Sequence, residues 1–166
     1  MLGCWDLKTR LGTFRLFYSE RGIDRVLFPG KRSALRAWGC FGQRAKPKVP
    51  AKVKRTFRKM RDYFRGRKVR FSITEIDRTG YSPFEKKVLQ TALKVPYGRT
   101  VSYGELARRS GRARAARAVG GVMAKNRTPI LIPCHRVVPK SGGIGHYSQG
   151  DRWKKTLLSL EKEVRG

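Results

Sequence analysis

The sequence predicts an α+β protein in two parts, because its apolar pattern changes period along the chain. Short alternating segments, typical of strands, dominate the first part, where one longer helical stripe accompanies them. Helical patterns separated by glycine and proline dominate the second part. The change falls near "DRTGYSP", residues 77–83, so we expect one domain over 1–76 and another over 77–166.

In the N-terminal part, the segments "GCWDLKT" and "GTFRLFYSE" alternate and meet near Leu11–Gly12, which predicts a β-hairpin. "GIDRVLFP" predicts a third strand, and "KVRFSITEI" predicts a fourth over residues 68–76. The basic, glycine-rich segment between them predicts a short helix around Ser33–Trp38 and then a loop. A stripe at helical spacing predicts a longer helix that ends at Gly66; its members are Val49, Val53, Phe57, Met60 and Phe64.

In the C-terminal part, Ser82-Pro83-Phe84-Glu85 forms a capping box with proline at the first helical position. The helix that follows is expected to bury Phe84, Val88, Leu89, Ala92 and Leu93. Two further helices, "SYGELARRS" and "ARAARAVGGVMAKN", flank a turn at Gly111. This pattern fits a helix-turn-helix and an ordinary αα-hairpin equally well.

The end of the chain predicts a strand, a glycine-rich turn and a returning segment within "RVVPKSGGIGHYSQG", followed by a helix over 151–164. Trp153, Leu157 and Glu161 are spaced at i, i+4 and i+8 in that helix. An acid therefore lies on or beside the buried stripe. If Glu161 is buried, it needs a partner, and an imidazole would serve.

The charge is strongly positive, with a formal value of +29 and a sequence pI of about 11.3. Residues 1–76 carry 21 basic and 5 acidic side chains, and residues 77–166 carry 19 and 6. Such a chain binds polyanions, which favours nucleic acid as a partner, although an even spread is also typical of a general basic bias. Five arginines nevertheless fall within 108–117.

Several classes are disfavoured by what the sequence lacks. It has three cysteines at wide spacing and two histidines, without Cys-x-x-Cys or zinc-ligand spacing, so we expect neither a disulfide framework nor a metal site. It has no apolar run long enough for a membrane span and no signal-peptide pattern, so we expect a cytoplasmic protein.

The segment "ILIPCHRVV" places Cys134 beside His135 directly after Pro133. A turn that begins at this proline would bring free backbone amides to the thiol, and amides and nearby cations favour thiolate. An imidazole can accept the thiol proton directly or through a water, and Glu161 could orient that imidazole. The alternative is a buried structural cysteine, which is the commoner case.

"PCHRVV", preceded by "RAVGGVMAKNRTPILI", resembles the active-site region of the O6-alkylguanine-DNA alkyltransferases, and the match runs over residues 95–161. The resemblance implies a ribonuclease-H-like α/β domain followed by a winged helix-turn-helix-like domain. It also implies that Cys134 is the alkyl acceptor, with His135 as its base through a water and Glu161 behind it. Tyr103 would protonate the leaving guanine, and Asn126 would be the hinge between the recognition helix and the active-site turn.

The same resemblance implies that residues 113–124 form a recognition helix that binds the minor groove, with an arginine inserted into the base stack. The expected DNA contacts are Tyr103, Arg112, Arg114, Ala115, Ala116, Arg117, which is the inserted arginine, and Gly120. The expected substrate pocket comprises Pro129, Val137, Tyr147, Ser148, Gln149 and Lys154.

Two positions depart from the family pattern. Gln149 stands where the family often has glycine, which puts bulky alkyl groups in doubt. Arg127 stands where some members have proline, which predicts a looser loop after Asn126. The Cys/His set that binds structural zinc in some members is absent, so we expect neither a metal nor a cofactor.

The expected function is direct reversal of DNA damage. The protein would flip O6-alkylguanine out of duplex DNA and transfer the alkyl group irreversibly to Cys134, once per molecule. O6-methylguanine would be the main substrate and O4-methylthymine a secondary candidate, and the protein would act as a monomer, associated with the nucleoid in a prokaryote. The alternatives are a helix-turn-helix protein that binds a lesion or a sequence without chemistry, and a cysteine hydrolase, although no oxyanion-hole motif is evident.

Overall fold

The computed structural model describes residues 3–30 and 49–163. It has a mixed α+β fold, as the sequence predicts, in two compact units, Met1–Asp77 and Arg78–Gly166. The helix expected around Ser33–Trp38 lies outside the described residues. Within the described ranges, no helix is long and apolar enough to cross a bilayer.

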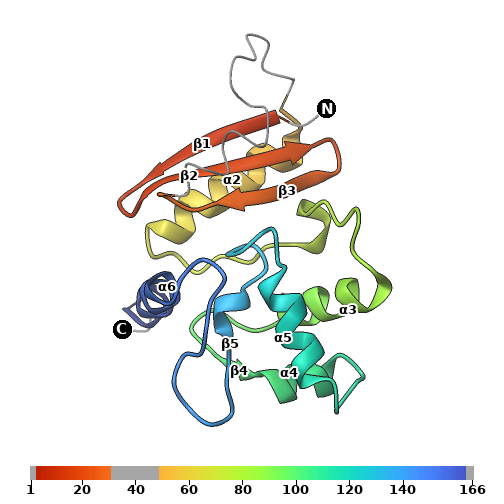
Figure 1. Cartoon of the computed structure of the whole chain (residues 1–166). Coiled ribbons are helices and arrows are strands. Elements are labelled where there is room, and N and C mark those ends of the chain that lie inside the picture. The colour runs from red at the N-terminus through yellow and green to blue at the C-terminus, as the bar shows by residue number, and fades with distance from the viewer. Residues whose placement is uncertain (1–2, 31–48, 164–166) are drawn as a thin grey trace. The chain divides into compact units, whose positions relative to one another are not determined.

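The first unit is a three-stranded antiparallel sheet with one long helix, shown in Figure 1. The predicted strands are confirmed as β1 (Gly3–Thr9), β2 (Gly12–Ser19) and β3 (Gly22–Leu27), in the order β1-β2-β3. Helix α2 (Ala51–Phe64) lies along one face of this sheet. Four predicted stripe residues on α2 are buried, namely Val53, Phe57, Met60 and Phe64, and Tyr63 joins them.

The strand predicted over residues 68–76 is wrong. Residues Ile73–Glu75 form a short 3-10 helix, η1, and Ile76 alone bridges to Ile23. The Ser72 side chain accepts a hydrogen bond within this turn while the Glu75 carboxylate accepts one from the Ser72 amide. These reciprocal caps satisfy the backbone locally, so the segment does not need a ladder partner.

The second unit is built mainly from helices. The predicted capping box at Ser82 is confirmed, and it begins α3 (Pro83–Ala92). Helices α4 (Tyr103–Arg109) and α5 (Ala116–Ala124) contact each other and α3, and the turn between them contains Gly111 at φ +83°. Helix α6 (Asp151–Glu163) ends the described chain.

Three details of this unit differ from expectation. Helix α5 begins at Ala116 rather than at residue 113, because the Ala115 amide closes a turn onto the Arg112 carbonyl. Phe84 and Leu93 of the α3 segment are only half-buried, whereas Val88, Leu89 and Ala92 are buried as predicted. Residues 139–150 form turns and coil, so the returning segment adds no strand.

A small parallel sheet supports the segment that carries the cysteine. Strand β4 (Val101–Ser102) pairs with β5 (Val137–Val138), which directly follows a 3-10 turn, η2 (Cys134–Arg136). Because β4 runs straight into α4, this pairing connects the start of α4 to the end of the cysteine turn.

Candidate active site

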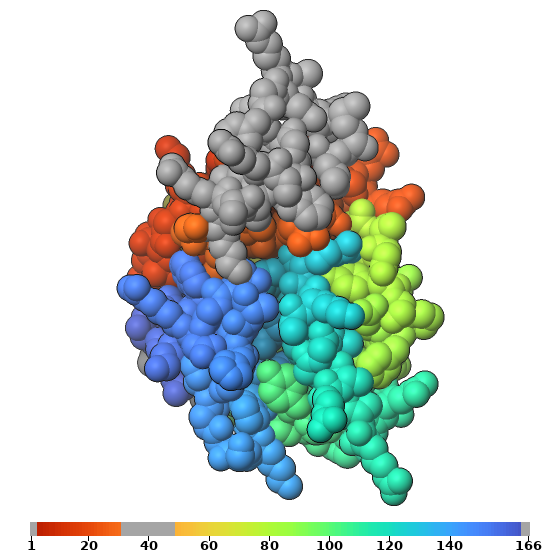
Figure 2. Space-filling model, in the orientation of Figure 1, coloured from red at the N-terminus to blue at the C-terminus, as the bar shows by residue number. Residues whose placement is uncertain are grey.

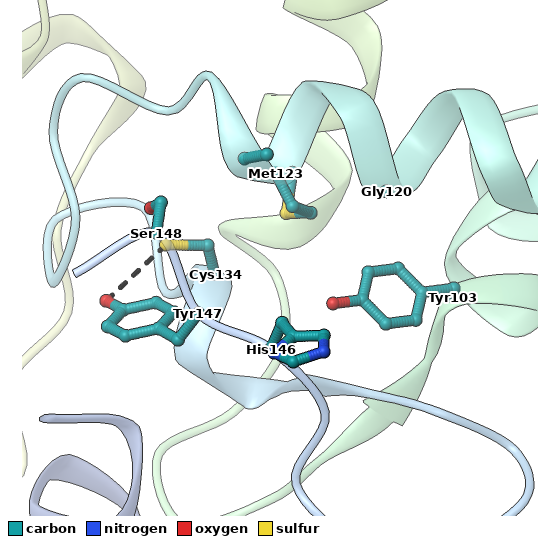
Figure 3. Close-up of a pocket in the computed structure, with 8 residues that line it drawn as sticks. Tyr103, Gly120, Met123, Cys134, His146, Tyr147 and Ser148 are labelled. Atoms are coloured by element: carbon teal, nitrogen blue, oxygen red, sulfur yellow. Dashed lines mark hydrogen bonds between the residues drawn. The ribbon is translucent and has the colours of Figure 1, made fainter. Parts of the chain in front are cut away.

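Cys134 lies at a pocket of about 300 Å³ in the second unit, which Figure 3 shows in close-up. Its side chain is 3% exposed, and its backbone begins the η2 turn directly after Pro133, as the sequence predicts. Helices α4 and α5 supply one wall, and the coil before α6 supplies the other. The described residues that line the pocket are Tyr103, Gly120, Met123, Ala124, Cys134, His146, Tyr147 and Ser148.

Asn126 holds the cysteine turn against the end of α5. Its side-chain Nδ2 donates to the Ile132 carbonyl at 3.0 Å and to Cys134 Sγ at 3.1 Å. Its Oδ1 accepts from the Thr128 amide at 3.0 Å. Since Asn126 is 4% exposed, these bonds are shielded from water, and one amide side chain fixes both the chain path and the sulfur.

Backbone strain is concentrated in the same connection. Ile130 has φ +77°, the only positive φ outside glycine among the described residues, and it is 1% exposed. A β-branched residue in this region costs on the order of 1–3 kcal/mol, so its surroundings must enforce it. The hydrogen bond from the Ile132 amide to the Thr128 carbonyl, at 3.0 Å, and the two Asn126 contacts provide that enforcement.

His135 and Glu161 form a fully buried pair behind the cysteine turn. His135 Nε2 lies 2.7 Å from Glu161 Oε1, and both side chains are inaccessible to solvent. The same carboxylate accepts from Arg136 Nε at 2.9 Å and from the Gly98 amide at 2.9 Å. The expectation that a buried Glu161 finds an imidazole partner is confirmed, and Arg136 is a partner that the sequence reasoning did not foresee.

The pKa shifts of this pair define its resting charges. Burial raises the pKa of the Glu161 carboxyl, but the hydrogen bonds and charges of His135 and Arg136 outweigh burial and lower it to about 2. Burial lowers the pKa of His135 more strongly than Glu161 raises it. The imidazole is therefore neutral near pH 7. Because a carboxylate only accepts hydrogen bonds, Nε2 carries the proton and Nδ1 carries the basic lone pair.

Burial raises the pKa of the Cys134 thiol, which corrects the expectation that its surroundings favour thiolate. Hydrogen bonding of Cys134 with Asn126 and Tyr147 and the charge of Lys154 oppose this shift, but they are weaker than the loss of hydration. Cys134 is therefore a thiol at rest. Its Sγ lies 3.7 Å from Tyr147 Oη, the contact drawn as a dashed line in Figure 3.

Tyr103 faces Cys134 across the pocket from the first turn of α4, with its hydroxyl directed into the cavity (Figure 3). Burial raises the pKa of Tyr103, and the charge of a Cys134 thiolate would raise it further. The phenol therefore stays protonated and can donate a hydrogen bond to a molecule in the pocket. Gly120 of α5 lies against its ring, where an added Cβ would make ordinary contact at 3.9 Å.

The residues predicted to contact DNA gather around α5. Arg112, Arg114 and Arg117 are exposed, while Ala115, Ala116 and Gly120 are partly exposed. Long side chains project into solvent from the green-to-teal part of the chain that contains α4 and α5 (Figure 2). This unit thus presents cations beside a strip of small residues, next to the mouth of the Cys134 pocket.

Not every residue predicted for the pocket lies on its wall. Tyr147 and Ser148 line it, whereas Pro129 and Val137 are buried outside the described lining. Gln149 donates from Nε2 to Ser148 Oγ at 3.3 Å and so lies beside the wall. Lys154 is inaccessible to solvent and donates from Nζ to the Val137 carbonyl at 2.7 Å, so it acts from behind the turn.

Three lining residues escaped prediction, namely Met123, Ala124 and His146. Met123 and Ala124 follow Gly120 by three and four positions on α5, so helical spacing carried a usable signal. His146 precedes Tyr147, and its exposed Nδ1 lies 3.6 Å from Asp151 Oδ2. No comparable signal marked His146, because it sits in irregular coil.

The expectation of a looser loop at Arg127 is wrong. Its Nη2 donates to the Thr79 carbonyl at 2.7 Å, and its guanidinium lies 4.5 Å from the centre of the Tyr81 ring. Its backbone amide donates to Tyr81 Oη at 3.0 Å. These three contacts anchor the start of the connection between Asn126 and Cys134. Among the described residues, no group of three or more potential ligands could hold a metal ion.

Comparison with known proteins agrees with this geometry. The family model described as 6-O-methylguanine DNA methyltransferase, DNA binding domain, matches residues 83–163. A methylated-DNA--protein-cysteine methyltransferase of Mycobacterium leprae is 46% identical over 100 residues, which cover 60% of this chain and 59% of that protein. The one of Mus musculus is 55% identical over 82 residues, covering 49% of this chain and 39% of that protein. The aligned part thus spans less than two thirds of these curated relatives.

Solved structures match over a longer span. A crystal structure of the Mycobacterium tuberculosis O6-methylguanine methyltransferase has a TM-score of 0.79 and 30% identity, covering 99% of this chain and 94% of that one. The Mycobacterium tuberculosis structure in complex with DNA has a TM-score of 0.75 and 29% identity, covering 97% and 93%. The chain therefore belongs to the 6-O-methylguanine DNA methyltransferase family.

Proposed function

We propose that this protein repairs O6-alkylguanine in DNA by transferring the alkyl group irreversibly to Cys134. One observation carries the proposal: Cys134 Sγ lies at a pocket of about 300 Å³, is held by Asn126 at 3.1 Å, and is followed in sequence by a histidine on a buried carboxylate. Relatives named methylated-DNA--protein-cysteine methyltransferases support it. O6-methylguanine is the main substrate, and O4-methylthymine is a secondary candidate.

The transfer is a displacement at the alkyl carbon. The Cys134 thiol loses its proton through a water to Nδ1 of His135, and the resulting imidazolium is stabilised by Glu161. Sulfur then bonds to the alkyl carbon as the bond from that carbon to guanine O6 breaks. Tyr103 donates a proton to the departing guanine, and its phenolate regains one through solvent from His135. The product is a thioether, which no group in the pocket can hydrolyse, so each molecule acts once.

The lesion must leave the base stack before it can reach Cys134, at a cost of a few kcal/mol. We assign α5 as the recognition helix in the minor groove, with Arg117 inserted into the vacated stack. Its neighbours Arg112 and Arg114 hold the phosphates. The partly exposed Ala115, Ala116 and Gly120 support this assignment, because small side chains let the helix backbone approach the groove closely.

The remaining proposals concern the fold of each domain, the oligomeric state and the location of the protein. We propose that residues 77–166 form a winged helix-turn-helix-like domain and residues 1–76 a ribonuclease-H-like supporting domain. The protein acts as a monomer on duplex DNA, in the cytoplasm, and needs no cofactor or metal. Its net charge of +29 supports a nucleic-acid partner.

Intact-mass spectrometry tests the proposal after the protein is mixed with duplex DNA that carries O6-methylguanine. One added methyl group is expected, located by peptide mapping on Cys134 and lost in Cys134→Ala. Cys4→Ala is the matched control, since Cys4 is only partly buried and lies in the other unit, and it must react normally. Tight DNA binding without a change in mass would overturn the proposal and favour a binding protein without chemistry.

A further inference from the structure

A second feature, in the first unit, combines an exposed aromatic side chain with unpaired cations. Trp5 on β1 is 42% exposed, although it is large and apolar, and its ring packs against Phe57 of α2 in a tilted arrangement, with 4.2 Å between centroids. These two rings border a pocket of about 440 Å³ between β1 and α2. An indole held by a ring beneath it and open to solvent above offers a flat apolar face to a ligand.

Cations surround this face and continue beyond it. Lys54, Arg58 and Arg61 line the same pocket, and their spacing at i, i+4 and i+7 places them on one side of α2. Arg61 also lines an adjoining pocket of about 500 Å³, where it is joined by Lys8, Arg10 and Arg65. The two pockets have Arg61 in common and follow each other along α2. We call them together the basic groove, defined by Trp5, Phe57 and these six cations.

The groove is distinguished by its lack of acids. No Asp or Glu is among the described residues that line either pocket, and none of the six cations has an acidic partner there. By contrast, Arg55 and Lys59 on the same helix pair with the buried Glu75, at 3.5 and 2.8 Å. Part of the charge on one side of α2 is thus compensated by a carboxylate within the protein, whereas the groove cations are left available to a ligand.

We propose that this basic groove binds single-stranded nucleic acid, with an unpaired base stacked on Trp5 and the phosphates held by the cations. The six cations of the groove favour a polyanionic ligand. The exposed indole of Trp5 favours a polyanion that can also stack a flat ring on it. A duplex offers no free base face, whereas a single strand offers both bases to stack and phosphates to pair. This inference does not rest on alkyl transfer, because the groove lies within the first unit and Cys134 lies in the second.

The test is fluorescence anisotropy with labelled oligothymidylate and oligouridylate of about 16 nucleotides, a site size typical of single-strand binding folds. Trp5→Ala is expected to weaken binding about tenfold or more, and to remove the quenching of tryptophan fluorescence that stacking on Trp5 would cause. Stronger binding of oligothymidylate would indicate DNA as the ligand, and stronger binding of oligouridylate would indicate RNA. Either result supports the proposal that the groove binds a single strand.

A second variant removes two groove cations, and a control variant removes two cations elsewhere. The comparison separates binding in the groove from loss of folding and from the general effect of net charge. Arg58→Gln/Arg61→Gln is expected to lower the slope of log affinity against log salt by about 1.4, at about 0.7 per phosphate contact on a single strand. Arg55→Gln/Arg67→Gln removes the same charge from two exposed arginines that pair with Glu75 and Asp62 outside the groove. This control should keep nearly the full slope.

Two results would overturn the proposal. If Arg58→Gln/Arg61→Gln and Arg55→Gln/Arg67→Gln lower the salt slope of strand binding equally, binding depends only on the net charge of the protein. Poly-glutamate binding that falls with Trp5→Ala as much as strand binding does would identify an acidic polypeptide as the occupant. Methyl transfer from duplex DNA to Cys134 is measured in parallel and should be unchanged in both groove variants, so failure of the groove is distinct from failure of the repair function.

Discussion

Replacement of Glu161 by glutamine probes the buried relay most directly. The carboxylate accepts from His135 Nε2 at 2.7 Å, from Arg136 Nε at 2.9 Å and from the Gly98 amide at 2.9 Å. Glutamine has one acceptor oxygen, and its amide group would face these donors with donors of its own. The change also leaves Arg136, which is 7% exposed, without its counter-charge.

The size of the effect follows from the pKa of Glu161, which is lowered from 4.5 to about 2. At 1.36 kcal/mol per pKa unit, ionisation of this group contributes about 3 kcal/mol to the free energy of unfolding. Because the folded pKa is depressed, the contribution is fully present above the unfolded pKa near 4.5. It is lost as the pH falls toward 2, and more than half is lost by pH 3.

Urea unfolding at pH 7, 5, 4 and 3 measures this contribution. Wild type should be more stable than Glu161→Gln by about 3–5 kcal/mol at pH 7, the usual cost of removing one partner of a buried ion pair. The gap should shrink by about 2 kcal/mol at pH 3, which is the part of the ionisation contribution that is lost by that pH. Glu105→Gln is the control, because Arg108 and Arg109 also lower the pKa of Glu105 to about 2, but on a surface exposed to water.

The control should change stability little at any pH, because solvent screens the exposed charges around Glu105. A constant gap between wild type and Glu161→Gln from pH 7 to pH 3 would refute the reasoning. It would mean that Glu161 is not an ionised acceptor in the folded protein.

Three further predictions concern groups around the cysteine turn. Asn126→Ala leaves the Thr128 amide without its acceptor, whereas the Ile132 carbonyl still accepts from the Cys134 amide, so chemical denaturation should show a loss of about 2 kcal/mol in the free energy of unfolding. The variant also removes a hydrogen bond that favours the thiolate, so the pH dependence of Cys134 alkylation should shift to higher pH. Arg127→Ala removes the side-chain contacts to Thr79 and to the Tyr81 ring, so it should raise hydrogen exchange over residues 127–133 and slow methyl transfer. Unchanged exchange would contradict an anchoring role for this side chain. Lys154→Met removes a buried cation that favours the thiolate, so the pKa of Cys134 should rise, whereas the exposed Lys155→Met should leave that pKa unchanged. Lys154→Met also removes the donor to the Val137 carbonyl, so its melting temperature should fall, and that of Lys155→Met should not.

The sequence predicted elements well where local signals agreed and poorly where they competed. Ser-x-x-Glu occurs at residues 72–75 and again at 82–85, and both segments form reciprocal caps. At Ser82 the following proline and the apolar stripe both indicate a helix, as the capping box does, so α3 could be predicted. At Ser72 the apolar alternation of a strand opposed the cap, and the cap prevailed because it satisfies the backbone without any partner strand.

In the site, too, contacts that follow from local sequence patterns could be predicted, and contacts that depend on the three-dimensional fold could not. The pairing of His135 with Glu161 could be inferred, since an acid on a buried stripe requires a partner. Arg136 could not be assigned to that carboxylate, because its direction depends on the η2 turn and on the Val95 carbonyl, which accepts from its Nη1 at 2.7 Å. Nor could the raised pKa of Cys134 be foreseen, since nearby cations are visible in the sequence and the depth of burial is not.

A raised thiol pKa is consistent with the proposed reaction, in which Cys134 acts once. If Cys134 were thiolate at rest, it would be open to oxidation and to stray alkylating agents, and each such event would consume the molecule. A buried thiol avoids this loss, and in the proposed reaction its reactivity depends on removal of its proton through His135. That transfer places a positive charge between Glu161 and the new thiolate, which stabilises both ions only while the displacement proceeds. The burial that suppresses the resting nucleophile would therefore also strengthen the charge pair on which the proposed transfer depends.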